Sequence, residues 1–535
     1  MKPFAAPVDD ILFSLDAIAG AHRMPGWDGG LARDLADHFA GFAEAEIAPL
    51  DAPGDAQGCR LEQGRVRMPE GFAALYRRYA EQGWPGLTAP EEFGGQGMGA
   101  AMGAITSEIF SGACHSLQMV TGLVPGAIRT LLRFGTADQQ ARLIPPLAEG
   151  RWLSTMCLTE AGAGSDLSRI RCRASRDGDN WRITGEKIFI SGGDQDLSDG
   201  ILHLVLARTS AEGVKGLSLF LCRAARDDGS RNGITVTRIE QKLGLHASPT
   251  CQLAFDAAEA ELLGEEGAGL RAMFTMMNHA RLDVALQGVA HAARAHDIAA
   301  SYAAGRVQGR GADGPVTLDA HADIRRMLDE MDALALGARA MAHLPLVMME
   351  AAEPPEIVEF LTPVAKVFCS EVGIGAADTA IQVLGGYGYL REYGVEQTWR
   401  DARICAIYEG ANGIHAAALA SRGLRAGQGA DAFAGLIRDI AEETASPSLA
   451  RNLDDWCAAR RRVESAADPG ALAHDFMQAT GLILFLALWA RIGARAGAAP
   501  RPSDYARLAA MVPRRFGPDL AAAGARVAAG SSARG

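Results

Sequence analysis

The spacing of apolar residues changes along this chain of 535 residues. In the first 150 residues apolar side chains recur every three or four positions, and Gly/Pro breaks separate the periodic segments. This pattern predicts helices over 31–47, 72–79 and 128–134. From about residue 154 the apolar runs become short, β-branched or alternating, which predicts strands in a compact β-barrel or sandwich. The predicted strands are 181–190, 201–207, 217–222, 234–239 and 250–255.

Helical spacing returns after Gly269 and continues to about residue 425. Four segments with short connections, 269–304, 319–350, 355–384 and 411–424, predict a helical bundle. A glycine-rich join at 423–430 leads to a last helical region, 431–520, followed by an Ala/Gly/Ser tail that we expect to fray.

The predicted fold is therefore mainly α with a central β domain. Its parts are an N-terminal helical domain with a short N-terminal extension (1–153), a β domain (154–265), a four-helix bundle (266–428) and a C-terminal helical extension (429–535). A chain of this length is expected to form three or four domains.

Composition narrows the class of protein. The net charge of −12 argues against a general nucleic-acid binder, which needs a basic surface. The nine cysteines contain no C-x-x-C pair, so we expect reduced thiols in a cytoplasmic protein and no metal site. We expect no signal peptide at the start of the sequence, because Asp9, Asp10 and Asp16 interrupt the apolar core that one requires. The longest apolar run, 481–490, is about half the ~20 residues that a membrane span requires.

The segment I-Y-E-G at 407–410 places a carboxylate between an apolar stretch and a glycine. In an apolar pocket, loss of hydration would raise the pKa of Glu409 and make it a stronger base. Gly410 permits close approach of the backbone to a ligand. The alternative is a glutamate near a helix N-terminus that interacts with the helix dipole, and the tetrapeptide by itself favours this second interpretation.

Five more segments accompany it: L-T-E-A-G-A-G-S-D at 158–166, G-E-K-I-F-I-S-G-G at 185–193, K-L-G-L-H-A-S-P-T at 242–250, N-H-A-R-L at 278–282 and Q-V-L-G-G-Y-G at 382–388. Taken alone, the first is an ordinary Gly/Ser/Asp loop and Phe189 in the second is a core residue. In this order and spacing, the six segments resemble the acyl-CoA dehydrogenase family over about residues 70–420. The opening at 6–13 and the C-terminal extension resemble the branch that includes 3-(methylthio)propanoyl-CoA dehydrogenase and broad-range long-chain relatives.

The resemblance implies a flavoenzyme that oxidises an acyl-CoA thioester to the trans-2-enoyl-CoA. FAD would lie between the β domain and the bundle, Glu409 would be the catalytic base, and electrons would pass to an electron-transferring flavoprotein. Arg306 and Gln308 resemble a pair that reaches the cofactor pyrophosphate across a subunit interface, so a homo-oligomer, a dimer or a dimer of dimers, is expected. The position before Arg281, where some family members carry the base, is Ala280.

Residue by residue, the resemblance implies cofactor contacts and substrate contacts. The family usually has threonine at the position of Ser191 and often proline at that of Ala161, and neither change removes a needed functional group. The implied substrate contacts are Ser165, Asn278, Arg281 and Gly410. The implied cofactor contacts are Met156, Leu158, Thr159, Gly164, Ser165, Phe189, Ile190, Ser191, Arg306, Gln308, Gln382, Leu384, Gly385, Gly386, Ala411 and Gly413.

Three alternatives remain open. An acyl-CoA oxidase would use oxygen as the acceptor. A DNA-associated alkylation-response flavoprotein of similar length would need a basic C-terminal domain, but residues 430–535 hold 13 Arg, no Lys and 11 acidic residues. A scaffold without activity is disfavoured because every polar role is filled.

Overall fold

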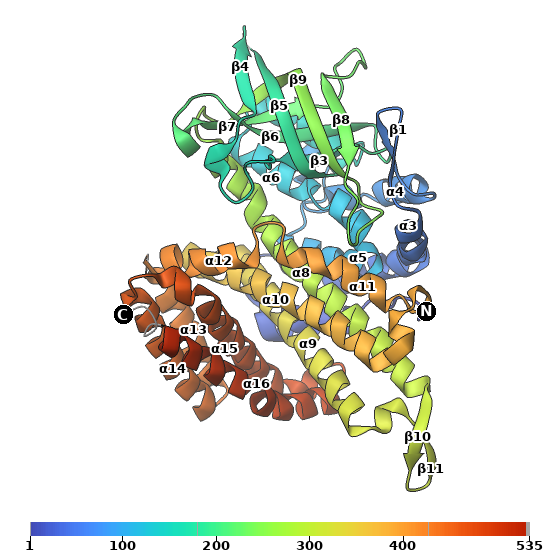
Figure 1. Cartoon of the computed structure of the whole chain (residues 1–535), viewed down its shortest axis with the longest axis vertical. Helices are drawn as coiled ribbons and strands as arrows, with labels where there is room; N and C mark the ends of the chain where they lie inside the picture. Colours follow the sequence, from blue (N-terminus) through green and yellow to red (C-terminus); the bar gives the residue numbers. More distant parts are fainter. Residues whose placement is uncertain (1, 179, 426, 531–535) are drawn as a thin grey trace. The chain divides into compact units, whose positions relative to one another are not determined.

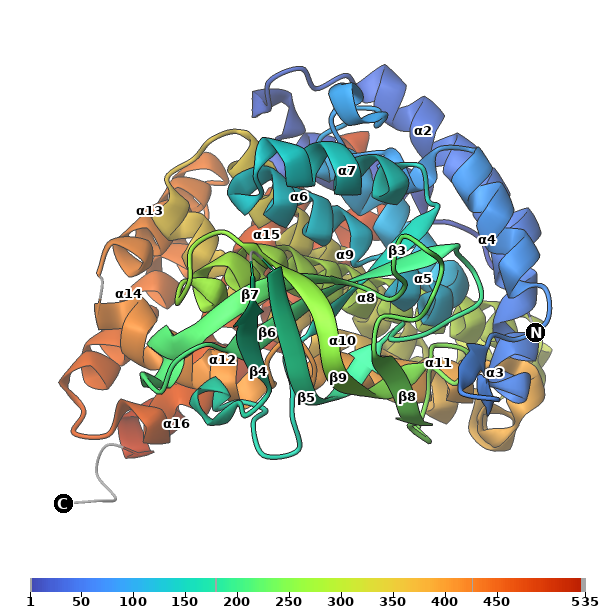
Figure 2. The ribbon, with the colours of Figure 1, turned by 90° about the horizontal axis from the view of Figure 1, so that it is seen from above.

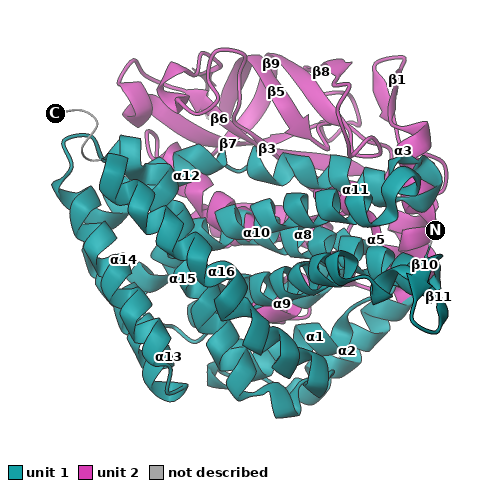
Figure 3. Ribbon diagram, turned by 60° about the horizontal axis from the view of Figure 1, so that its bottom comes forward, with its two compact units in different colours: residues 1–41, 104–112, 281–535 teal, residues 42–103, 113–280 magenta. Residues whose placement is uncertain are grey.

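The structure is a computed structural model, and it describes residues 2–178, 180–425 and 427–530 (Figure 1). Two compact units make up the chain. Unit 1 comprises residues 1–41, 104–112 and 281–535, and unit 2 comprises residues 42–103 and 113–280 (Figure 3). Helix α5 (Ala100–Thr121) contributes to both units and loses helical geometry at Cys114.

Unit 2 is built on a seven-stranded sheet in the order β3-β6-β4-β5-β9-β7, with β8 paired to β9. A further pairing of β6 with β7 closes the sheet on itself, which confirms the predicted β domain of barrel type. The strands are β3 (Trp152–Cys157), β4 (Arg173–Asp177), β5 (Asn180–Ser191), β6 (Gly200–Arg208), β7 (Leu217–Arg223), β8 (Ile234–Ile239) and β9 (Thr250–Leu263). All five predicted strands are present. The sequence pattern missed β3 and the polar, mostly exposed β4.

Helices of unit 2 flank this sheet. Helices α6 (Val124–Phe134) and α7 (Ala137–Ala148) pack against β3 (Figure 2). Helix α7 begins with a capping box in which Thr136 and Gln139 bond each other's backbone amides. The remaining elements of this unit include α3 (Asp51–Gln57), α4 (Phe72–Glu81) and a hairpin of β1 (Arg60–Glu62) and β2 (Arg65–Arg67).

Unit 1 contains the predicted bundle. Helix α8 (Gly269–Gly305) enters it at Arg281, and α9 (Ala322–Glu350), α10 (Pro355–Leu384) and α12 (Asn412–Ala418) follow. These bounds agree with three of the four predicted segments within a few residues, and a π-helical turn, Leu419–Gly423, extends the fourth. Helices α1 (Val8–Phe13), α2 (Gly29–Phe42) and α11 (Val395–Ala402) and the hairpin of β10 (Val307–Gly311) and β11 (Gly314–Thr317) complete this region.

The C-terminal extension forms four helices: α13 (Gln428–Glu443), α14 (Pro447–Ser465), α15 (Ala473–Ala494) and α16 (Pro502–Gly530). Their buried side chains, including Trp456, Phe485 and Trp489, belong to the same hydrophobic core as those of α9 and α10. The expected fraying of residues 521–530 is wrong, because α16 runs through them and buries Ala523 and Val527. The rest of the predicted tail, 531–535, lies outside the described residues.

Helix α15 is the most apolar helix of the extension. Together with the turn before it, residues 469–494, it is long and apolar enough to cross a membrane by length and composition, but 72% of its most apolar window is buried inside the molecule. Trp489 Nε1 donates a hydrogen bond to the carbonyl oxygen of Ala333 at 3.0 Å. These contacts are typical of a core helix.

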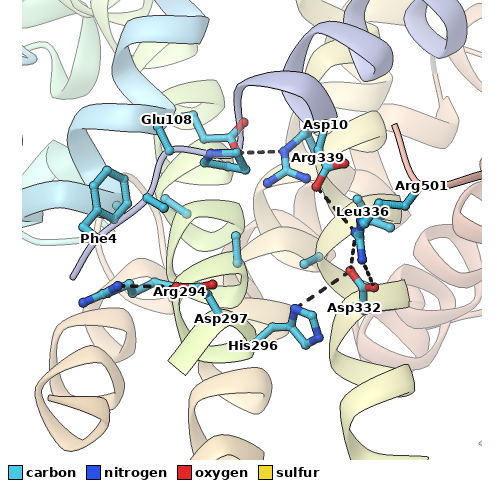
Figure 4. Close-up of a pocket in the computed structure, with 17 residues that line it drawn as sticks. Phe4, Asp10, Glu108, Arg294, His296, Asp297, Asp332, Leu336, Arg339 and Arg501 are labelled. Carbon is cyan, nitrogen blue, oxygen red and sulfur yellow. Dashed lines mark hydrogen bonds and ion pairs between the residues drawn. The ribbon is translucent and has the colours of Figure 1, made fainter. Parts of the chain in front are cut away.

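Charged side chains join the extension to the rest of unit 1 around a cavity of about 270 Å³ (Figure 4). Arg339 Nε donates to Glu108 Oε1 at 2.7 Å, and both side chains are almost fully buried. Arg501, directly before α16, donates to Asp332 at 2.8 Å and lies 3.6 Å from Asp10 of α1. Because buried charges need partners, this cluster links α1, α5, α9 and the extension.

Candidate active site

Glu409 occupies a short loop before α12. Its φ angle is +54°, and that of Gly410 is +95°. A Cβ atom at position 410 would lie 2.7 Å from His415 Nε2, so this position requires glycine. Helix α12 is capped by Ala411, which places Glu409 before the helix rather than in its first turn. Glu409 therefore lies two residues before the N-cap of α12.

The Glu409 carboxylate is partly withdrawn from water. Its Oε2 atom is buried and has no hydrogen-bond partner among the described residues. Burial raises the pKa of Glu409 to about 7, although the cations of Arg281 and Lys366 lower it and the carboxylate of Asp283 raises it slightly. A carboxylate with this pKa is well suited to accept a proton near neutral pH.

Three side chains bind the carbonyl groups of this loop. His415 Nε2 donates to the Glu409 oxygen at 3.0 Å, and Arg281 Nε donates to the same oxygen at 3.4 Å. Burial lowers the pKa of His415 to about 4, so its ring is neutral. Lys366 Nζ donates to the Gly410 oxygen at 2.8 Å. Sequence reasoning missed Lys366, although a lone lysine in the apolar stretch V-A-K-V-F was the available signal.

A fourth contact holds the preceding residue. The Tyr408 hydroxyl donates to Gln287 Oε1, and Gln287 Nε2 donates to Asp283 Oδ2 at 3.1 Å. Gln287 and Asp283 lie on α8, while Lys366 lies on α10. The loop around Glu409 is therefore attached to two bundle helices.

In unit 2, a buried side chain holds the loop at 158–166, which is predicted to contact the flavin. The fully buried Lys187 Nζ donates to the Leu158 oxygen at 2.8 Å and to Glu160 Oε1 at 2.9 Å. Glu160 in turn accepts bonds from two backbone amides, at Arg171 and Cys172. A Cβ at Gly162 or Gly164 would meet nothing within 4 Å, so this part of the loop is open to a ligand. Lys187 is a second positioning residue that sequence reasoning missed.

The end of β5 presents an aromatic side chain. Phe189 has a φ angle of +59° and is 61% exposed, so the core interpretation of this residue is wrong. The side chain of Ile190 is buried, and Ser191 Oγ lies 3.6 Å from Met119 Sδ. An exposed aromatic ring beside an open glycine loop fits a planar aromatic ligand such as the flavin ring.

A second group of predicted cofactor residues meets in unit 1. The guanidinium of Arg306 lies 5.4 Å from the ring centre of Tyr387, in the 3₁₀ turn Gly385–Tyr389. Gln308 lies on the exposed strand β10, and its carbonyl oxygen contacts His321 Nε2 at 2.7 Å. The structure thus brings Arg306 together with the glycine segment that ends α10.

The predicted residues divide between the two units. In unit 2, Gly164, Ser165, Phe189 and Asn278 are exposed, Met156, Thr159 and Ser191 are half-buried, and Leu158 and Ile190 are buried. In unit 1, Gln308, Gln382, Gly385, Gly386 and Gly413 are exposed, Arg281, Arg306, Glu409, Gly410 and Ala411 are half-buried, and Leu384 is buried. The three buried side chains leave only backbone groups for contact with a ligand.

Comparison with known proteins identifies the class. The N-terminal, middle and C-terminal domain models of acyl-CoA dehydrogenase match residues 32–151, 155–258 and 267–424. The chain belongs to the acyl-CoA dehydrogenase family. It is accordingly an FAD-dependent oxidoreductase that acts on acyl-CoA.

One curated relative and two solved structures show how similar this chain is to individual proteins. The chain is 42% identical to 3-methylmercaptopropionyl-CoA dehydrogenase of Ruegeria pomeroyi, over 78% of this chain and 76% of the relative. A crystal structure of Caenorhabditis elegans ACDH-11 in complex with C11-CoA shares the fold at a TM-score of 0.82 and 21% identity, over 96% of this chain and 91% of the other. A structure described as an electron transferring flavoprotein of Acidaminococcus fermentans matches at 28% identity and a TM-score of 0.64, over 72% and 95% of the two chains.

Proposed function

We propose that Glu409 is the base that removes the Cα proton of a bound acyl-CoA. The observation that carries this assignment is its buried Oε2, which has no hydrogen-bond partner in the described structure and belongs to a carboxyl with a pKa of about 7. When bound, FAD would supply the acceptor for the hydride that leaves Cβ. The proton moves to Glu409, the Cα–Cβ bond becomes double, and the product is the trans-2-enoyl-CoA.

The substrate carbonyl needs hydrogen-bond donors while charge develops on its oxygen. The backbone amide of Glu409 is the proposed donor from this chain. Because Arg281 and His415 both bind the Glu409 carbonyl, they orient the peptide unit that follows the base.

Replacement of the base tests the assignment. Glu409→Gln preserves size and hydrogen-bonding capacity but cannot accept the proton. We expect FAD and acyl-CoA to bind normally and the rate of flavin bleaching in anaerobic rapid mixing to fall by ~10²–10⁴-fold. Bleaching at the wild-type rate would exclude Glu409 as the base.

We propose 3-(methylthio)propanoyl-CoA, or a short acyl-CoA of similar length, as the substrate. The relative with 42% identity is named for this thioether substrate. The test compares it with pentanoyl-CoA, in which a methylene replaces the sulfur, and with butanoyl- and octanoyl-CoA. A higher kcat/KM for the thioether than for pentanoyl-CoA supports the assignment, and a preference for octanoyl-CoA contradicts it.

We propose that electrons leave to an electron-transferring flavoprotein, in keeping with the family and with one matched structure. The other candidate is an oxidase that uses oxygen. Enzyme reduced by substrate without oxygen and then exposed to air distinguishes the two: slow reoxidation and fast transfer to the flavoprotein support the dehydrogenase. We further propose that this protein acts in the cytoplasm, because its nine cysteines are free.

We propose that the cofactor site is shared between subunits of a homo-oligomer. Apolar side chains near Arg306 are exposed, with Val307 at 54%, Tyr389 at 85% and Leu390 at 44%, and such a patch favours an interface. Arg306→Ala should lower the FAD content of the purified protein without unfolding it. Arg310→Ala, an exposed arginine of the same hairpin, is the matched control. An FAD-bound, active monomer in gel filtration would contradict the shared site.

A further inference from the structure

A continuous set of hydrogen bonds connects the C-terminal extension to the loop that carries Glu409. Gln478 of α15 donates through Nε2 to Glu371 Oε2 at 2.7 Å. Asn412 Nδ2 donates to the other oxygen of the same carboxylate, Oε1, at 3.2 Å. Lys366 Nζ donates to Asn412 Oδ1 at 2.9 Å and to the Gly410 oxygen at 2.8 Å. The connection therefore ends on the residue that follows the base.

The residues joined by these hydrogen bonds are buried or half-buried, and burial makes hydrogen bonds stronger. Lys366 is fully buried, and Glu371, Asn412 and Gln478 are half-buried. All four bonds of the chain join a neutral amide group to the ion of Glu371 or Lys366, and such charge-assisted bonds are about twice as strong as neutral ones. Ser370 Oγ accepts a second bond from Asn412 Nδ2 at 3.2 Å, which further restricts the asparagine. The side chains between Gln478 and the Glu409 loop therefore have little freedom to move.

The position of the Glu409 carboxylate depends on its backbone. Oε2 has no hydrogen bond among the described residues that could hold it directly. The left-handed φ of +54° at Glu409 is unfavourable for a non-glycine residue and persists because surrounding bonds hold it. Those bonds are made to the carbonyl groups of Glu409 and Gly410. Loss of the Lys366 contact would leave the Gly410 carbonyl group free to move.

We propose that the C-terminal extension positions the catalytic carboxylate, and that Gln478 and Glu371 are positioning residues in a chain that continues through Asn412 and Lys366 to the Gly410 carbonyl. Residue 478 lies beyond the segment that the family's C-terminal domain model matches, 267–424. The extension thereby adds a support for the base from outside the family's three domains. This inference rests on the proposed role of Glu409.

The first test removes the donor. Gln478→Leu keeps a similar volume but cannot bond Glu371. The rate constant of flavin bleaching at saturating substrate should fall about tenfold, because misplacement of a catalytic group slows the chemical step. The half-saturating substrate concentration and the FAD content should stay unchanged. Trp489→Phe is the matched control, since it removes a different bond from α15 to the bundle, the one to Ala333. It should lower the melting temperature and leave the bleaching rate unchanged.

The second test exchanges donor and acceptor. Gln478→Glu places two carboxylates next to each other and should reduce the bleaching rate more than Gln478→Leu does. Adding Glu371→Gln gives the amide of residue 371 a carboxylate to donate to, while its oxygen still accepts from Asn412. The double variant should recover most of the lost rate. Such a rescue does not follow from a general loss of stability.

The outcomes separate this inference from the proposed function. Normal bleaching in Gln478→Leu and Gln478→Glu, with strong loss in Glu409→Gln, would overturn the positioning role and leave the base intact. Normal bleaching in Glu409→Gln would overturn the base itself. Equal losses in Gln478→Leu and Trp489→Phe, without rescue in the double variant, would reduce the extension to a stabilising role and overturn the proposal.

Discussion

The carboxylate of Glu409 lies near two cations that lower its pKa, yet desolvation outweighs both of them and the pKa rises to about 7. The ordinary value is 4.5, so the folded protein holds this proton more firmly than the unfolded chain. The sign of the effect on stability follows from this difference. Between pH 4.5 and about 7 the folded state binds the extra proton, and its stability therefore decreases as the pH rises through that window.

Glu409→Gln should consequently be more stable than the wild type at alkaline pH. The amide carries no charge to bury, so the substrate-free variant should gain up to about 3 kcal/mol of unfolding free energy above pH 7. The difference should vanish below pH 4.5, where the carboxyl is neutral in both the folded and the unfolded protein. Thermal unfolding of both proteins from pH 5 to 9 measures it. An equal melting temperature at pH 8.5 would contradict the raised pKa.

The same pKa predicts a pH dependence of the reaction. Only the deprotonated carboxylate accepts the Cα proton, so the second-order rate constant for flavin bleaching should rise with pH and level off above about 7. Lys366, whose pKa burial lowers to about 8, loses its proton just above this range, so the rise is best measured below pH 8. Stopped-flow measurements across pH 5.5–8 test the first inflection. A profile that is flat down to pH 5.5 would show that the base has an ordinary pKa.

At the scale of the element, helix α9 lies against α15 with almost no space between them. A Cβ at Gly337 would lie 2.3 Å from Phe485 Cε2 and 2.6 Å from Trp489 Nε1. Both rings are buried in the shared core and cannot move aside easily. Glycine at this position of α9 therefore allows the extension to pack on the bundle.

Gly337→Ala should destabilise the protein by about 1–3 kcal/mol through overpacking. Gly375→Ala is the matched control on α10, because a Cβ there meets nothing within 4 Å. In that exposed helical position alanine should stabilise by about 1 kcal/mol through its higher helix propensity. Opposite shifts of the melting temperature are the expected result. A stabilising Gly337→Ala would show that α9 and α15 are less closely packed.

At the scale of the molecule, the C-terminal extension completes the core of unit 1. The aromatic side chains Trp456, Phe476, Phe485 and Trp489 lie in one cluster with Phe360 and Leu361 of α10. This packing on the bundle buries the apolar side chains of the extension. Arg501 adds charged contacts to Asp332 and Asp10.

Deletion of residues 431–535 should expose the apolar faces of α9 and α10. The expected results are aggregation or altered assembly and loss of FAD, because large exposed apolar patches drive association. Gel filtration with light scattering and the flavin-to-protein absorbance ratio measure both. A soluble truncated protein with wild-type assembly and activity would show that the bundle is complete without the extension.

The sequence alone determined most of the order of elements and the family to which the chain belongs. Apolar spacing identified five strands of the sheet and the long helices α9 and α10, because these segments bury one face or all of their side chains. It missed β4, R-A-S-R-D, because an exposed polar strand has no apolar pattern to reveal it. The six short segments, in their order, indicated the family and singled out Glu409.

Only the tertiary structure decided what surrounds that glutamate. The partner of Gln478 is Glu371, 107 residues earlier, and Lys366 bonds a carbonyl 44 residues later. Such contacts, and the loss of water around the carboxylate, arise when distant segments pack together. Local periodicity reports which faces are buried, whereas hydration and hydrogen-bond partners depend on what those faces meet. The raised pKa of Glu409 is therefore a property of the folded protein.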